Sequence, residues 1–146
     1  MRFFGLILVA ILFFSVNAVA QEQFRATAFF DTVVAENTCA PWDGHAVRVS
    51  LMHAGQDYPR WMISFYRFPV KTGEWLNFSG TDAGYITFCK EHNACVPALE
   101  AKVMLGVMTE NEISGELQAP FEGGAPGSYA SYPFSSAIIS GHEICG

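Results

Sequence analysis

The chain has 146 residues, and fourteen acidic residues against eight Lys and Arg give it a formal net charge of −6 at pH 7. An acidic chain without a basic cluster argues against a nucleic-acid binder, and it gives no attraction to anionic lipid. The length suffices for one domain with a modest core.

Residues 1–20 have the layout of a secretory signal peptide, with Arg2 ahead of an apolar run at 3–16 and small residues up to Ala20. The apolar run is shorter than the ~20 residues of a membrane-spanning helix. We therefore predict cleavage after Ala20 and a secreted or periplasmic protein that is not inserted in a membrane. The remainder, 21–146, is predicted to be a single all-β domain, in which seven Lys and Arg face fourteen acidic residues, a net charge of −7.

Alternation of apolar and polar side chains dominates the rest of the chain. In "HAVRVSLMH", Val47, Val49 and Leu51 share one side and the residues between them are polar. Period-two patterning with β-branched and aromatic residues is typical of a half-buried strand. Strands are predicted near residues 24–34, 45–53, 60–68, 85–89, 102–107, 113–119 and 129–139, with a weaker one at 75–78.

The connections between these runs have the composition of turns. Gly55, Asp57 and Pro59 indicate a hairpin connection, "TENE" turns the chain again, and "EGGAPGS" is a glycine-proline loop. This loop does not resemble a phosphate cradle, because neither a lysine nor a helix start follows it. No stretch has the pattern of an amphipathic helix. Several short strands separated by turns predict an all-β fold, a small antiparallel β-sandwich or, alternatively, a barrel.

All four cysteines follow the predicted leader. An even number of cysteines in an oxidising compartment favours disulfides over metal thiolates. Three pairings are open, and we favour Cys89–Cys95, which are close in sequence, together with Cys39–Cys145. On the chain-entropy model, the long bridge stabilises the fold by about 4–5 kcal/mol.

The loop "CKEHNAC" is the densest group of reactive side chains in the sequence. Its cysteines do not have the C-x-x-C spacing of zinc sites, and a thiol nucleophile would have to stay reduced after export. A disulfide across so short a span pinches the chain into a protruding loop, which loses little entropy on docking. The alternative is that the bridge merely staples a hairpin connection whose polar residues face water. The candidate binding residues are Lys90, Glu91, His92 and Asn93.

The same loop resembles that of the Ivy-type periplasmic inhibitors of vertebrate lysozyme. Their loop has the sequence Cys-Lys-Pro-His-Asp-Cys, is closed by a disulfide, and plugs the lysozyme active site with its histidine. This chain is similar at Cys89, Lys90, His92 and Cys95, and residues up to 117 look like the strand-turn-strand that follows. The resemblance implies that His92 is the plug and Lys90 its neighbour. An acidic body would favour approach to a basic enzyme.

The chain also departs from that family's pattern. Glu91 stands where the family has proline, and one extra residue lengthens the loop. Cys39 and Cys145 have no counterpart in the family. The resemblance is confined to residues 89–117.

Motifs for catalysis are incomplete in this sequence. It has no G-x-S-x-G elbow. The pair His142-Glu143 starts an H-E-x-x-H zinc motif, but position 146 is glycine. Asp43-Gly44-His45 is explained most simply as a turn before a strand. We therefore predict that the protein is not an enzyme and that it uses no metal or cofactor. A small hydrolase remains an alternative, with a site assembled from Asp43, His45, His53 or His142.

Three tryptophans offer a further alternative, an aromatic platform for a sugar or another flat ligand. Large aromatics in a small β protein are mostly core, since each buries ~150–250 Å². Trp61 has the core pattern, whereas Trp42 lies in a loop and is expected to be partly exposed. We favour packing for Trp42, Trp61 and Trp75.

The sequence thus favours a secreted, disulfide-stapled β domain that acts by binding a protein or ligand. Its sharper form is an inhibitor of a secreted hydrolase such as lysozyme, acting through residues 90–93. The expected partner is a basic secreted protein, and no nucleic acid is expected. Besides the hydrolase, a structural envelope or surface component without a site remains an alternative.

Overall fold

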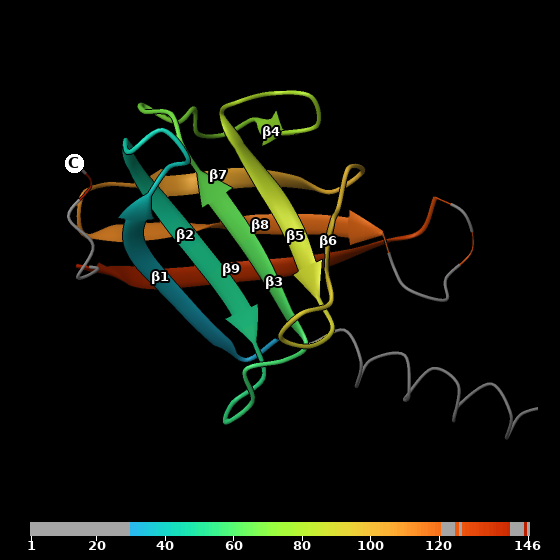
Figure 1. Ribbon diagram of the computed structural model, residues 1–146. Coiled ribbons are helices and arrows are strands. Elements are labelled where there is room, and N and C mark those ends of the chain that lie inside the picture. The colour runs from blue at the N-terminus through green and yellow to red at the C-terminus, as the bar shows by residue number, and fades with distance from the viewer. Residues whose placement is uncertain (1–29, 121–124, 126, 141–144, 146) are drawn as a thin grey trace, which may run out of the picture.

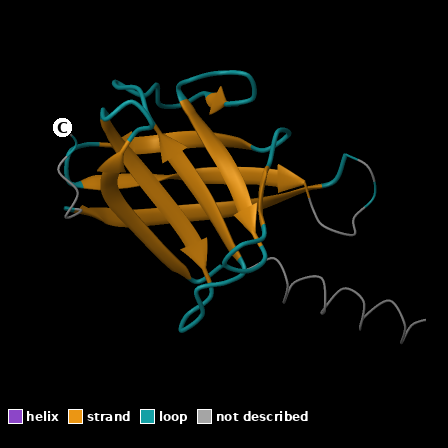
Figure 2. Cartoon of the chain, in the orientation of Figure 1, coloured by secondary structure: helices purple, strands orange, loops and turns teal. Residues whose placement is uncertain are grey.

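The computed structural model describes residues 30–120, 125, 127–140 and 145. Within this part of the chain all regular structure is β, with nine strands and no helix (Figures 1 and 2). None of these residues therefore belongs to a helix long and apolar enough to cross a membrane. The predicted leader 1–20, the start of the predicted strand 24–34, most of the glycine-proline loop, and His142 lie outside the described residues.

The strands follow the predicted order along the chain. Each expected strand whose residues are described has a counterpart, although the first begins at Thr32 and continues to Cys39. A short strand after the cysteine loop was not predicted. The strands are β1 (Thr32–Cys39), β2 (His45–Met52), β3 (Arg60–Phe65), β4 (Trp75–Leu76), β5 (Gly84–Cys89), β6 (Cys95–Pro97), β7 (Lys102–Met108), β8 (Glu112–Pro120) and β9 (Tyr129–Ile139).

All nine strands belong to one sheet, in the order β4-β7-β8-β9-β1-β2-β3-β5-β6. Neighbours pair antiparallel except β1 and β9, which pair in parallel at Ala35↔Ile138 and Glu36↔Ile139. The sheet curls so that β7, β8 and β9 run across behind β1, β2, β3 and β5 (Figure 1). The predicted all-β class is confirmed. The two layers are halves of one curled, mixed sheet, because the parallel pair joins them.

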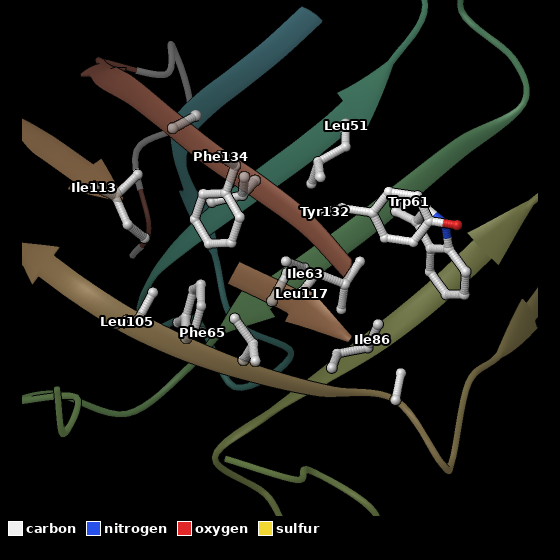
Figure 3. Packing of buried hydrophobic residues seen from close by; sticks show 14 of the residues in the cluster. Leu51, Trp61, Ile63, Phe65, Ile86, Leu105, Ile113, Leu117, Tyr132 and Phe134 are labelled. Carbon is white, nitrogen blue, oxygen red and sulfur yellow. The ribbon is translucent and has the colours of Figure 1, made fainter. Parts of the chain in front are cut away.

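The core fills the space between the two layers (Figure 3). The alternating residues of β2 that were predicted to share a face, Val47, Val49 and Leu51, are all buried. Each such side chain stabilises the fold by roughly 1.5–3 kcal/mol relative to exposure. The opposite layer contributes buried apolar side chains from β7, β8 and β9. They include Val103, Leu105, Ile113, Leu117, Tyr132 and Phe134.

Both predicted disulfides are present. Cys39 and Cys145 are joined across 106 positions of sequence with a Cα–Cα distance of 5.5 Å. Cys89 and Cys95 are joined across six positions, with a Cα–Cα distance of 4.0 Å. Disulfides of this kind are typical of an oxidising environment.

The long strands give this sheet two distinct ends. β2 begins at His45 and ends at Met52, and β3 returns antiparallel from Arg60 to Phe65. Arg60 pairs with Cys89 of β5. The β2–β3 connection and the cysteine loop therefore lie at one end of the sheet. The turn before β2 and the segment after β3 lie at the other.

Candidate functional site

Residues 90–94, here called the finger, form the connection between β5 and β6. Cys89 and Cys95 are register partners in the antiparallel ladder, so the disulfide links residues that already face each other. Within the finger, the Lys90 amide donates to the Ala94 carbonyl at 3.0 Å, and the Ala94 amide donates to the Glu91 carbonyl at 3.1 Å. Disulfide and turn together fix the backbone of the finger.

The side chains of the finger face outward from a base in which Cys89 is buried and Cys95 is exposed. Cys89 is fully buried at the end of β5, whereas the four residues that follow are exposed. The base is held in the sheet because β5 pairs with β3 on one side and with β6 on the other. The exposed residues are Lys90, Glu91, His92 and Asn93.

His92 is not simply directed into solvent, because it contacts Tyr58 of the β2–β3 connection. The Tyr58 hydroxyl lies 3.1 Å from His92 Nδ1, and the two rings meet edge to face with centroids 6.2 Å apart. In the neutral imidazole, a Tyr58 hydroxyl that donates to Nδ1 leaves the ring proton on Nε2. Tyr58 thus contacts the histidine at Nδ1, and Nε2 is the ring nitrogen on the side away from this contact.

Arg60 completes the neighbourhood of Tyr58. Its guanidinium carbon lies 4.7 Å from the centroid of the Tyr58 ring, within range of a cation–π interaction. Sequence reasoning missed both Tyr58 and Arg60, because they lie about thirty positions before the finger and nothing in "QDYPR" indicates the contact. The register Arg60↔Cys89 is what brings them beside it.

The charge of this end differs from the charge of the whole chain. The β2–β3 connection and the finger contain Asp57, Glu91 and Lys90, and Arg60 follows as the first residue of β3. A third carboxylate lies at this end, because Asp31 accepts a hydrogen bond from the Ala54 amide at 2.6 Å. Three carboxylates and two cations thus lie close together, so this end carries little net charge. Any electrostatic attraction to a basic partner therefore comes from the acidic remainder of the chain.

The two described histidines of the alternative hydrolase site, His45 and His53, do not converge, and His142 lies outside the described residues. His45 is the first residue of β2 and His53 follows its last, which places them about 25 Å apart at ~3.3 Å per residue. His45 Nε2 lies 2.9 Å from Asn37 Oδ1, and the His53 ring stacks on Phe30. Asp43 lies in the predicted turn. Among the described residues, no group of three or more His, Cys, Asp or Glu is placed to hold a metal ion.

Trp61 and Trp42 lie as predicted, in the core and in a loop, whereas Trp75 is 37% exposed in the short strand β4. Trp61 is buried, whereas Trp42 is 51% exposed in the turn before β2. The Trp42 ring meets that of Tyr66 edge to face, with centroids 5.5 Å apart. Burial, and next the neighbouring Tyr85, raise the pKa of Tyr66 to about 12.

Comparison of the chain with known proteins finds no matching family model, no matching curated protein and no matching solved structure. The resemblance to Ivy-type inhibitors therefore rests on residues 89–117 alone. The strand-turn-strand part of that resemblance corresponds to β7 and β8.

Proposed function

We propose that this protein binds a secreted protein through the finger and, in the sharper form, inhibits a lysozyme-like hydrolase. The observation that carries the proposal is a disulfide between directly opposed residues that presents an exposed, oriented histidine. A fixed loop of this kind loses little conformational entropy when it docks, so more of its contact energy remains as affinity.

The chemistry of His92 suits the active site of a glycoside hydrolase. Such sites present a pair of Asp or Glu carboxylates flanking the scissile bond. An imidazole that donates from Nε2 can hydrogen-bond to one of these carboxylates and occupy the space of the substrate. Lys90, exposed beside it, supplies a positive charge that suits the second carboxylate.

Export belongs to the same proposal. The leader-like residues 1–20 would be removed after Ala20, and the protein would act in the periplasm or outside the cell. The two disulfides support an oxidising destination. Intact mass of the exported protein tests this step, and a mass that begins at Gln21 is expected. A mass that retains residues 1–20 would contradict it.

The binding proposal is tested by titrating a vertebrate lysozyme with purified residues 21–146. Inhibition that saturates near one-to-one is expected, and His92→Ala should weaken it at least tenfold because the plug is lost. His45→Ala is the matched control, since His45 is also exposed but lies at the other end of β2. A large molar excess that leaves the lysozyme rate unchanged removes the sharper form of the proposal.

A further inference from the structure

A pocket of about 840 Å³ opens at the end of the sheet opposite to the finger. Several elements contribute to its apolar wall: β2, the segment after β3, the end of β7, and β9. Small-molecule sites are typically clefts of about 300–1,000 Å³ with mostly apolar walls and a few polar groups. The apolar side chains used below are Phe68, Val70, Met108 and Ile138.

The wall of this pocket is fixed by backbone hydrogen bonds. The Ile138 amide donates to the Asn111 carbonyl at 2.8 Å, which ties the β7–β8 turn to β9. The Gly73 amide donates to the Leu105 carbonyl at 2.8 Å, which ties the segment after β3 to β7. The pocket is therefore largely preformed, and filling it costs little ordering of the protein.

Phe68 leaves apolar surface uncovered at this pocket. The side chain is 42% exposed, and its ring centroid lies 5.2 Å from that of His45. An aromatic ring held open beside Val70 and Ile138 offers a face for an aliphatic or aromatic body. Burial of such a body would be favourable at roughly 25 cal/mol per Å² of apolar area.

The polar groups of the pocket determine which head group a bound ligand can carry. Glu110 supplies a carboxylate, and His45 and Asn37 are bonded to each other at 2.9 Å. Neither Lys nor Arg is among the lining residues in the described part of the chain. A carboxylate in a pocket whose described lining contains no Lys or Arg favours a positively charged or donor-rich head group and disfavours an anionic one.

We propose that this pocket binds a small amphipathic amine. Its apolar body packs against Phe68, Val70 and Ile138, and its ammonium group lies beside Glu110. The site is independent of the finger, because β2 and β3 separate the two ends. Failure of one proposal therefore leaves the other in place.

Calorimetric titration of residues 21–146 with octylamine, octanol and octanoate tests the head-group assignment. Saturable binding is expected, with octylamine tightest and octanoate weakest. Glu110→Gln should reduce the preference of octylamine over octanol by about two- to fivefold, the range of a solvent-exposed charge pair. Glu112→Gln is the matched control, because this carboxylate is exposed nearby and does not line the pocket.

Methyl NMR on the unmutated protein locates the ligand without any risk of misfolding. Octylamine should shift the methyl signals of Val70, Met108 and Ile138 and leave Val103, which is buried elsewhere in the core, unchanged. The proposal is overturned if none of the three compounds saturates, if octanoate binds as tightly as octylamine, or if the shifts fall outside the pocket. His92→Ala should leave octylamine binding unchanged.

Discussion

Tyr58 orients His92, the exposed histidine of the finger. Its hydroxyl contacts His92 Nδ1, while Arg60 lies over its ring. A free histidine would lose rotamer freedom on docking, and Tyr58 has already restricted it.

Tyr58→Phe removes this hydroxyl and keeps the ring. We expect inhibition of lysozyme to weaken about fivefold, because a neutral hydrogen bond contributes about 1 kcal/mol. Titrations of both proteins provide the measurement, and the imidazole nitrogen shifts of His92 should change with them. Tyr129→Phe, at an exposed tyrosine of β9, is the control. Equal inhibition by Tyr58→Phe and the unmutated protein would show that the contact does not orient His92.

Tyr66 makes stability depend on pH in the alkaline range. Its pKa is raised to about 12 in the folded protein, first by burial and then by Tyr85, from an ordinary value of 10.0. The folded state therefore holds this proton more tightly than the unfolded state. This contribution is fully present below about pH 10 and is lost as the pH rises through about 12.

Urea unfolding between about pH 9 and pH 12 measures this loss. Tyr66→Phe should lose less free energy of unfolding over that interval than the unmutated protein. Part of the loss should remain, because burial also raises the pKa of Tyr132. An identical decline in both proteins would contradict the assignment to Tyr66.

At the scale of elements, the local alternation of apolar and polar residues predicted most strands. It did not predict which strands far apart in the sequence pair with each other. β2, β3 and β9 were predicted because apolar and polar residues alternate along their sequences. The second half of β1 was missed, since "AENTC" is largely polar and gains its place by pairing with β2 and β9. The parallel pair Ala35↔Ile138 joins residues too far apart in the sequence for any local pattern. The finger was found from its cysteines, and Tyr58 was missed for the same reason of distance.

Gly84, the first residue of β5, is required by a close approach between strands. A Cβ atom placed there would lie 2.1 Å from the Ser64 carbonyl oxygen, so the backbone would have to move. We expect Gly84→Ala to lower the free energy of unfolding by about 2–3 kcal/mol. Gly106→Ala is the matched control in β7, where the nearest atom is 3.7 Å away, and should change it by less than about 1 kcal/mol. Urea unfolding of both variants measures these changes in free energy. Equal losses in Gly84→Ala and Gly106→Ala would contradict the close approach of Gly84 to Ser64.

At the scale of the whole molecule, the two disulfides have different tasks. Cys39–Cys145 closes almost the entire described chain, whereas Cys89–Cys95 closes only the finger. The curled sheet separates the finger from the pocket, so the long bridge supports a scaffold and the short one shapes a binding surface.

Removing each bridge with paired alanine substitutions tests this division. On the chain-entropy model, loss of Cys39–Cys145 should lower the free energy of unfolding by about 5 kcal/mol, and loss of Cys89–Cys95 by about 2 kcal/mol. At a temperature where both variants are folded, loss of Cys89–Cys95 should weaken the inhibition of lysozyme more than loss of Cys39–Cys145. Thermal unfolding and inhibition titrations give the two readouts. A variant without Cys89–Cys95 that still inhibits fully would refute the need for a pinched loop.

The most direct test of the finger as the binding surface is an amide NMR titration of labelled residues 21–146 with a vertebrate lysozyme. We predict that the amide signals of 90–94, Tyr58 and Arg60 shift or broaden, while those of His45 and Glu110 at the opposite end stay in place. Unchanged spectra at stoichiometric lysozyme, or changes concentrated at the opposite end, would contradict the account.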